Sequence, residues 1–403
     1  MRCYLVGGAV RDRLSGRPVV DRDWVVVGAT AEEMVAQGFT PVGKDFPVFL
    51  HPGTHEEYAL ARTERKTAPG YRGFVFHADP DVTLEEDLAR RDLTVNAMAQ
   101  ADDGQVIDPF GGRADLQQRV LRHVAPAFVE DPVRILRVAR FAARFTDFTV
   151  AAQTMALMRS MVEQGEVDSL VPERVWQEFA RGLMEALPSR MIDVLREAGA
   201  LARLVPQLAR LWQAPDGSGA ATTGVAAMAS LDEAAHAGSE LSVRVAVLLQ
   251  ALATVPVSAR SGLDVQAIEA ACTDLKIPVE CRDLAVATGR ERATIQAGAA
   301  DAASALAVLE RCDALRKPKR FGQLLEAVGF LGAGMSSTRS GILARWQSVL
   351  VAARAVDAGA IAQGVQGTGP ARAQSINAGV RTARVAAIEA ILAAPPFLPT
   401  NIP

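Results

Sequence analysis

Two carboxylates one residue apart, Asp21 and Asp23, stand directly before an apolar run at residues 24–27. Side chains alternate between the two faces of a β-strand, so this spacing places both carboxylates on one face, about 7 Å apart along the strand, with Arg22 pointing away. Such a pair suits two divalent cations, roughly 3.5 to 4 Å apart, that bind the attacking and leaving oxygens of a phosphoryl transfer. Aspartate is also a common turn residue, and a solvated strand entrance stays open as the alternative.

A glycine pair, Gly7 and Gly8, precedes the carboxylates at a point where a strand is expected to turn into a helix. Backbone N–H groups at such a turn can face an anion, and Arg11 follows closely. The short separation predicts that the glycines and the carboxylates converge at the same end of a sheet. Glu57, at the start of the expected strand EYALAR, is a candidate third metal ligand, and an exposed strand acid is an equally open interpretation.

The secondary structure expected around these groups changes along the chain from mixed strands and helices to helices alone. Up to about residue 125, short β-rich runs alternate with Gly-rich turns and helical segments such as LEEDLARRDLTVNAMA, which predicts an α/β domain. From about residue 126, apolar residues recur at helical spacing, as in PVRILRVARFAARF, ERVWQEFARGLMEAL and RMIDVLREAGALARLV. We therefore expect an α+β protein, in which a head with a small mixed sheet and helices precedes an all-α remainder. A loop or linker is expected at 214–224.

Composition sets broad limits on the class of protein. The chain has 403 residues, of which 49% are hydrophobic and 22% charged, as is ordinary for a globular protein. No apolar stretch reaches the roughly 18 to 20 residues of a membrane span, and charge at Arg11 interrupts any signal-peptide core, so we expect a cytoplasmic protein without a membrane partner. Four scattered cysteines predict neither disulfides nor a zinc site. A net charge of −3 does not exclude nucleic acid, because a local basic stripe can still bind phosphate.

A second group of candidate residues starts at the EDP sequence of residues 130–132. Asp-Pro is a common helix start, and this alone would explain Asp131 without any ligand. It does not explain Arg134, Arg137 and Arg140, which recur every three residues and form a stripe on one helix face. Neighbouring like charges repel unless an anion lies between them. A carboxylate and a forked guanidinium on one helix turn can also read the Watson–Crick edge of a base.

Five motifs in order along the chain resemble those of class II tRNA nucleotidyltransferases, the CCA-adding enzymes, in their proteobacterial branch. The motifs are LVGGAVRD with DRD at 5–12 and 21–23, RRDLTVNAM at 90–98, IDPFGG at 107–112, EDPVR at 130–134 and PERVW at 172–176. The resemblance is closest over residues 1 to about 200. It implies a nucleotidyltransferase head at 1–125, a helical neck with a nucleotide-selecting motif at 126–200, and a helical, tRNA-binding body and tail at 201–403.

The resemblance implies template-independent addition of CCA to the 3′ end of tRNA from CTP and ATP, with Mg²⁺ as cofactor and pyrophosphate as product. Asp21 and Asp23 would hold the metal ions, and Glu57 is kept as a further catalytic candidate. Asp131 would accept a hydrogen bond from the exocyclic amine of C or A, and Arg134 would donate to the base. The other nucleotide-binding residues that the resemblance carries over are Gly8, Arg11, Glu130, Arg137 and Arg140, together with Arg91, Asp92 and Asn96 on an expected RRDLTVNAM helix.

The segment at 222–256 resembles in outline the HD-type metal-dependent phosphohydrolase domain of some bacterial relatives. Gln250 and Ala251 stand where the His-Asp pair of that domain would fall, and Ala226 stands at the preceding histidine position. His236 is the only histidine in the segment. One histidine cannot build the site, so we expect no phosphohydrolase activity.

Two groups of residues have weaker assignments. His51 and His55 flank the turn HPGTH, are interpreted as solvated turn residues and receive no role. Dispersed basic residues are candidates for tRNA phosphate contacts, with a solvated helix end as an equal alternative. They include Arg311, Arg316, Lys317, Lys319 and Arg320.

Other functions stay open at this stage. A poly(A) polymerase shares the head and the Asp-x-Asp chemistry but adds A alone, and the lack of a long basic tail speaks against it. A relative that adds only CC or only A is not separated by these motifs. An RNA-binding protein with an inactive head would leave Asp21, Asp23, Arg91 and Arg134 without a purpose. The oligomeric state is not readable from the sequence.

Overall fold

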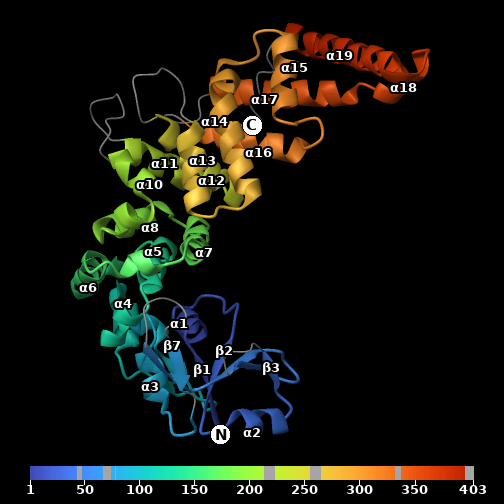
Figure 1. The fold of residues 1–403 in the computed structure, drawn as a ribbon. Helices are drawn as coiled ribbons and strands as arrows, with labels where there is room; N and C mark the ends of the chain where they lie inside the picture. Colours follow the sequence, from blue (N-terminus) through green and yellow to red (C-terminus); the bar gives the residue numbers. More distant parts are fainter. Residues whose placement is uncertain are drawn as a thin grey trace, which may run out of the picture. The chain divides into compact units, whose positions relative to one another are not determined.

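The computed structural model describes residues 1–42, 48–66, 74–77, 79–212, 223–254, 265–331 and 337–394 (Figure 1). The chain divides into two compact units, Met1–Pro206 and Gln207–Pro403. The first unit contains every described strand, and the second is helical throughout its described part. The linker expected at 214–224 lies, up to residue 222, outside the described residues.

A seven-stranded mixed sheet forms the base of the first unit, with strand order β3-β4-β5-β2-β1-β8-β9. Strands β2 and β5 run parallel, and the other neighbours run antiparallel. This confirms the small mixed sheet expected from the sequence. The strands are β1 (Arg2–Val6), β2 (Asp23–Val27), β3 (Thr40–Val42), β4 (Val48–Leu50), β5 (Glu57–Leu60), β8 (Ala99–Gln100) and β9 (Val106–Ile107), and the separate pairs are β6 (Thr63–Lys66) with β7 (Phe74–His77) and β10 (Val120–Leu121) with β11 (Thr149–Val150).

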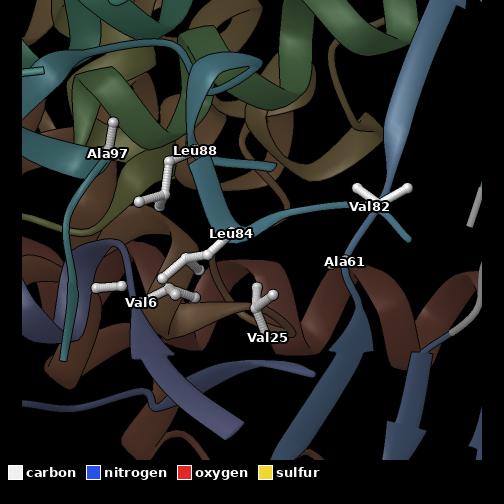
Figure 2. Packing of buried hydrophobic residues seen from close by; sticks show 8 residues of the cluster. Val6, Val25, Ala61, Val82, Leu84, Leu88 and Ala97 are labelled. Atoms are coloured by element: carbon white, nitrogen blue, oxygen red, sulfur yellow. The ribbon is translucent and has the colours of Figure 1, made fainter. Parts of the chain in front are cut away.

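The apolar run in β2 serves two cores, one on each face of the sheet. Val25 packs with the leucines of helix α3 (Leu84–Ala89), as Figure 2 shows. Val26 belongs to a separate cluster that includes helix α2 (Ala31–Ala36). Because successive side chains point to opposite faces and both faces are covered, the strand reads as a continuous run of apolar residues.

The segment LEEDLARRDLTVNAMA was expected as one helix, and this prediction is wrong. Helix α3 ends before the RRD sequence, a 3-10 turn (Thr94–Asn96) follows, and β8 comes next. The Asp92 carboxylate accepts a hydrogen bond from the N–H of Leu93 (2.8 Å), and the N–H of Thr94 donates to the carbonyl of Arg122 (2.9 Å). Backbone groups that a helix would use are therefore bonded elsewhere. The polar residues of this motif lie on a bend, not on a helix.

In the helical part of the first unit, α5 packs against both α7 and α8. The helical prediction for residues 132–145 is confirmed, and that for 173–187 is confirmed up to Leu183, where the helix ends. The segment RMIDVLREAGALARLV is interrupted at Gly199, where φ is +79°. The helices are α1 (Gly8–Leu14), α4 (Gly112–Gln118), α5 (Val133–Arg144), α6 (Ala152–Glu163), α7 (Pro172–Leu183), α8 (Ser189–Glu197) and α9 (Ala200–Leu204), with α10 (Pro206–Ala209) at the boundary.

The second unit is a helical assembly whose most buried helix is α12, which packs against α11, α14 and α16. Helices α17 and α19 also lie against each other. Across the described residues, no helix combines the length and the apolarity that crossing a membrane demands. The helices are α11 (Thr223–His236), α12 (Leu241–Gln250), α13 (Val265–Asp274), α14 (Val279–Ala297), α15 (Ala302–Arg311), α16 (Pro318–Phe330), α17 (Ser337–Ala355), α18 (Ala358–Gly364) and α19 (Gly369–Ala393).

Candidate active site

The register of the sheet brings three strand ends together. Val6 at the end of β1 pairs with Asp23 at the start of β2, and Asp23 pairs with Glu57 at the start of β5. Gly7 directly follows Val6, so the glycine turn and the carboxylates meet at one edge of the sheet. The predicted convergence is confirmed, with one correction: β2 begins at Asp23, so Asp21 precedes the strand and strand alternation does not place its side chain.

The turn after β1 requires glycine at position 7. Its φ is +71°, in the left-handed region, and its N–H donates to the carbonyl of Met98 (3.1 Å). A Cβ on Gly7 would stand 2.8 Å from Nη1 of Arg91, so a side chain would displace that guanidinium. Helix α1 then begins at Gly8 and carries Arg11 into the same region.

A cavity of about 520 Å³ opens at this sheet edge, and we call it the arginine cavity. Eight arginines and four carboxylates line it, so it carries an excess of positive charge although the whole chain has a net charge of −3. Such an excess suits a polyanion. The lining residues are Gly7, Gly8, Arg11, Asp23, Arg90, Arg91, Asp92, Asn96, Asp131, Val133, Arg134, Arg137, Arg140, Phe141, Arg144, Arg174, Gln177 and Glu178.

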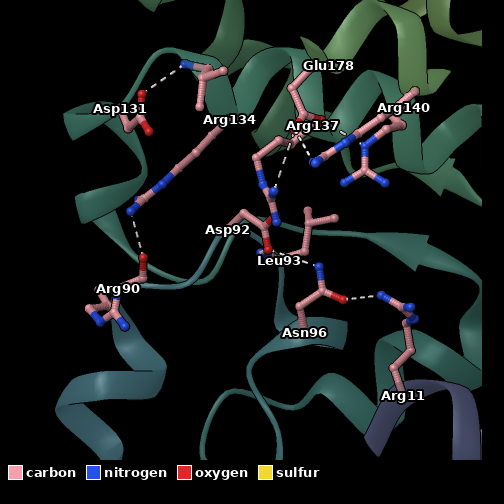
Figure 3. A network of polar contacts seen from close by, with 12 residues as sticks. Arg11, Arg90, Asp92, Leu93, Asn96, Asp131, Arg134, Arg137, Arg140 and Glu178 are labelled. Atoms are coloured by element: carbon pink, nitrogen blue, oxygen red, sulfur yellow. Dashed lines mark hydrogen bonds and ion pairs between the residues drawn. The ribbon is translucent and has the colours of Figure 1, made fainter. Parts of the chain in front are cut away.

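Asp92 is the centre of a bonded network in the arginine cavity (Figure 3). It is 6% exposed and accepts hydrogen bonds from Arg137 Nε (2.8 Å), from Asn96 Nδ2 (2.9 Å) and from the N–H of Leu93. Burial alone would raise the pKa of Asp92, but the charge of Arg137 and these hydrogen bonds lower it to about 2. Asn96 in turn accepts a hydrogen bond from Arg11. The network therefore fixes two arginines at the cavity wall.

The arginine stripe of α5 is neutralised by carboxylates from other parts of the chain. Arg140 Nε donates to the buried Glu178 (2.8 Å), and its guanidinium lies 4.5 Å from the ring centre of Phe141. Arg137 lies between Asp92 and Glu178, at 2.8 and 3.9 Å. The repulsion within the stripe is thus relieved by the protein itself as well as by any anionic ligand.

The two residues expected to read the base already have partners within the protein. Asp131 accepts a hydrogen bond from a backbone N–H at the start of α5 (3.2 Å) and another from Arg174 Nη2 (2.9 Å). Arg134 donates to the backbone carbonyls of Ala127 (2.6 Å) and Arg90 (2.7 Å), as Figure 3 shows for Arg90. Both side chains line the arginine cavity. A base that is read there must share these bonds or replace them.

Several lining residues were not predicted. Arg174 belongs to the PERVW motif and was not assigned to the nucleotide site, and its bond to Asp131 shows that it fixes the candidate base-reading carboxylate. Arg144 continues the stripe four residues beyond Arg140, so extending the helical pattern by one turn would have found it. Gln177 also lines the cavity, and we see no signal in the sequence that marks it.

A second cavity, of about 690 Å³, shares Asp23 with the first, and we call it the carboxylate cavity. Among the described residues, none forms a hydrogen bond or an ion pair with the carboxylate of Asp21, Asp23 or Glu57. Desolvation raises the pKa of Asp23, the positive charge of Arg91 opposes this rise, and the negative charge of Asp21 adds to it. The lining residues are Val19, Val20, Asp21, Arg22, Asp23, His55, Glu56 and Glu57.

The unbonded carboxylates fit divalent cations. Two repelling carboxylates without protein partners in the described structure are a suitable donor set for a hard cation, whereas Asp92 and Asp131 already accept bonds from arginines. Within the described ranges, no three acidic, His or Cys side chains form a group that could hold a metal ion, so Glu57 as a further ligand stays a prediction. Glu130 is half buried and is not among the described residues that line either cavity.

Comparison with known proteins gives the family of the chain. The poly A polymerase head domain family matches residues 3–122, and the probable RNA and SrmB-binding site of polymerase A matches residues 147–211. A multifunctional CCA protein of Azoarcus sp. (strain BH72) is 56% identical, and the alignment covers 98% of each chain. That of Burkholderia vietnamiensis (strain G4 / LMG 22486) is also 56% identical, over 98% of this chain and 99% of its own. The chain belongs to the multifunctional CCA protein family.

Solved structures give the same fold for this family member. The CCA-adding enzyme of Bacillus stearothermophilus, in complex with CTP, is 24% identical, with a TM-score of 0.64 over 95% of this chain and 88% of its own. The Thermotoga maritima CCA-adding enzyme, complexed with tRNA, is 20% identical, with a TM-score of 0.61 over 97% of this chain and 91% of its own. The α+β fold class expected from the sequence is therefore confirmed.

In the second unit, Gln250 and Ala226 stand at two positions where an HD-type phosphohydrolase would have its metal ligands. Gln250 is buried at the end of α12 and donates through Nε2 to the carbonyl of Ala285 (3.0 Å), so it serves as a core hydrogen-bonding residue. Ala226 is exposed on α11, and His236 contacts only the carbonyl of Asp232 among the bonds of the described residues. The expected lack of phosphohydrolase activity stays a prediction.

The basic cluster near residue 316 is paired with carboxylates of the second unit. Arg316 forms two hydrogen bonds to Asp313 (2.7 and 3.0 Å), and Lys319 Nζ lies 2.7 Å from Glu240. Arg311 is bonded to Glu291 in the same way. These pairs reduce the positive field of the cluster and favour the solvated helix end over a phosphate site.

Proposed function

We propose that this chain adds C, C and A to the 3′ end of tRNA from CTP and ATP and releases pyrophosphate. One observation supports it above all: the cavity that suits a triphosphate and the cavity with free carboxylates share Asp23. A nucleotidyl transfer requires two adjacent binding sites that share the metal ions, because the α-phosphate of the nucleotide and the hydroxyl of the RNA must contact the same ions. Membership of the multifunctional CCA protein family points to the same reaction.

The residues of the chain divide the work. Asp21 and Asp23 hold the divalent ions, which we propose to be Mg²⁺; when bound, these ions supply charge neutralisation and lower the pKa of the attacking hydroxyl. Arg11 and Arg91 bind the triphosphate beside the glycine turn. Asp92 fixes Arg137 at the cavity wall through the 2.8 Å bond between them.

Selection of the base falls to the start of α5. Asp131 accepts from the exocyclic amine of C or A while Arg134 donates to the ring, as its forked guanidinium permits. Both bonds draw on groups that already have protein partners, so the nucleotide competes with Arg174 for Asp131 and with two backbone carbonyls for Arg134. The carbonyl of Arg90 lies in the RRD motif, so Arg134 connects the base-reading helix to the segment that binds the rest of the nucleotide.

A gel assay tests the proposal directly. The purified protein is incubated with Mg²⁺ and a tRNA transcript that ends at the discriminator base, with CTP alone, ATP alone or both. We expect two additions with CTP and a stop at three with both, and no extension by Asp21→Ala. A long ladder with ATP alone would identify a poly(A) polymerase, and a stop at two with both would identify a CC-adding relative. The cytoplasmic location stays a prediction.

A further inference from the structure

The carboxylate cavity contains residues that the proposed nucleotide site does not use. Four carboxylates line it against one arginine, so its charge is opposite in sign to that of the arginine cavity. A free triphosphate is repelled by this lining. The residues without a part in the proposed mechanism are Val19, Val20, Arg22, His55 and Glu56.

Val20 presents an apolar side chain next to the free carboxylates. It is 85% exposed, the highest value among the large hydrophobic residues that the structure describes, and it directly precedes Asp21. A single exposed valine needs no explanation by itself. Here, however, the side chain lines a cavity that also contains the metal-holding pair, where apolar surface can pack against the face of a nucleobase.

The turn at 51–55 holds His55 at the same cavity. His51 Nδ1 accepts hydrogen bonds from the N–H groups of Gly53 and Thr54 (3.1 Å each), and its ring lies 5.5 Å from that of Tyr58. The N–H of His55 donates to the carbonyl of His51 (3.0 Å), and its φ of +58° lies in the left-handed region. His51 therefore orders the turn, and His55 lines the cavity.

Contacts with residues behind the cavity hold Glu56 in place. Trp24 stacks on Tyr58 with their ring centres 5.3 Å apart, and Trp24 Nε1 donates to Glu56 (2.8 Å). Arg22 also bonds to Glu56, at 3.4 Å. Glu56 is thus held and neutralised, while the neighbouring Glu57 pairs in register with Asp23. Both acids on the β5 side of the cavity are therefore placed by contacts within the protein.

We propose that Val20 and His55 contact the base of the 3′-terminal nucleotide of the RNA primer in the carboxylate cavity. This inference rests on the proposed function. The reaction joins two nucleotides at the carboxylates, and the arginine cavity suits the one with three phosphates. A terminal nucleotide of RNA carries a single phosphodiester charge, and its base can stack on imidazole and on apolar side chains. The carboxylate cavity, which shares Asp23, matches these properties.

Steady-state kinetics separate this role from a structural one. Val20→Ser and His55→Ala are each expected to raise KM for the tRNA transcript about tenfold, the usual order for losing a stacked contact, and to leave KM for CTP and kcat at saturating tRNA within about twofold. Val35→Ser is the matched control, because Val35 is an exposed valine of α2 outside both cavities. An unchanged KM for tRNA, or an equal rise in both KM values, would overturn the proposal.

Photocrosslinking tests the contact without requiring catalysis. A transcript that ends in 4-thiouridine is bound to the unaltered protein without nucleotide and irradiated, and the crosslinked peptide is mapped. We expect crosslinks within residues 19–22 or 51–57. Crosslinks confined to the arginine cavity would overturn the inference. If the unaltered protein crosslinks as expected but adds no nucleotide, the proposed function is wrong, whereas the proposed binding site for the RNA end is supported.

Discussion

The two cavities that share Asp23 differ in how their carboxylates are used. In the arginine cavity, Asp92, Asp131 and Glu178 each accept a hydrogen bond from an arginine, at 2.8 to 2.9 Å. In the carboxylate cavity, Asp21 and Asp23 have no such partner among the described residues. Carboxylates of the first kind hold other side chains in place, and those of the second kind are available to ions. The same residue type therefore holds arginines in place where it is bonded and is available to ions where it is not.

The largest expected effect comes from removing an available carboxylate. Asp23→Asn should lower the rate of nucleotide addition by about a thousandfold or more, because the charge that holds the ions is lost. Stability should be unchanged or slightly higher, because the substitution also removes repulsion with Asp21. Addition rates and urea midpoints measure the two effects. Asp102→Asn, at an exposed turn outside both cavities, is the control, and a marked loss of stability in Asp23→Asn would contradict the division between the cavities.

Removing a bonded carboxylate should, in contrast, lower the stability of the protein as well as its activity. Asp92→Asn removes the buried negative charge that pairs with the partly exposed Arg137, which costs roughly 2 to 3 kcal/mol of unfolding free energy. Addition should fall as well, because Arg137 and Asn96 lose their fixed positions. Urea unfolding of the variant beside the unaltered protein measures the loss. A variant as stable as the unaltered protein would show that the network around Asp92 does not hold the site together.

The sequence predicted which residues form this site better than it predicted the backbone conformation that carries them. Asp23 and the glycine pair could be placed at one sheet edge because only a short segment separates them, and the pairing of Val6 with Asp23 confirms it. The strand alternation expected for Asp21 was wrong, because β2 begins only at Asp23. The RRDLTVNAM helix was wrong because its apolar residues keep helical spacing, while the hydrogen bonds that end the helix come from Asp92 itself and from Arg122, which lies far along the chain.

Contacts between distant segments could not be predicted at all. Arg174 bonds to a carboxylate 43 residues away, and Glu178 bonds to Arg140 across 38 residues. No local pattern specifies which arginine meets which acid, since the choice depends on how α5 and α7 pack. The arginine stripe was visible in the sequence, but the carboxylates that neutralise it became visible only in the fold.

Acid unfolding gives a smaller and more specific test of the bonded network. The pKa of Asp92 is about 2 in the folded protein, below the value of about 3.9 for an unfolded chain. A depressed carboxyl pKa stabilises the fold fully above about pH 4, and this contribution is lost as the pH falls from about 4 towards 2. The size of this contribution is roughly 2 to 3 kcal/mol. Urea midpoints between pH 5 and pH 2.5 should fall less steeply in Asp92→Asn than in the unaltered protein, and parallel curves would show that Asp92 does not carry this dependence.

An arginine at the edge of the network should matter less than its centre. Arg144 Nη2 lies 3.2 Å from Asp12 and its side chain is one-third exposed. Arg144→Ala should raise KM for CTP and ATP several-fold by removing one positive charge from the cavity, with little change in kcat. Arg144→Lys should restore most of the affinity, because it keeps the charge. If the lysine variant binds nucleotide as weakly as the alanine variant, the forked geometry of Arg144, and not its charge, is what the nucleotide requires.

The smallest effect is expected in the second unit, where cations and carboxylates are also paired. Lys319 lies 2.7 Å from Glu240, with most of its side chain in solvent, so its positive charge is already matched. Lys319→Ala should therefore change the Kd for tRNA by less than about twofold and leave the slope of log Kd against log salt unaltered, whereas each lost phosphate contact would reduce that slope by nearly one. Glu240→Gln is the matched partner variant, since it frees the lysine. A clear loss of affinity and slope in Lys319→Ala would mean that tRNA phosphate displaces Glu240, so that this ion pair, unlike those around Asp92, opens to bind the substrate.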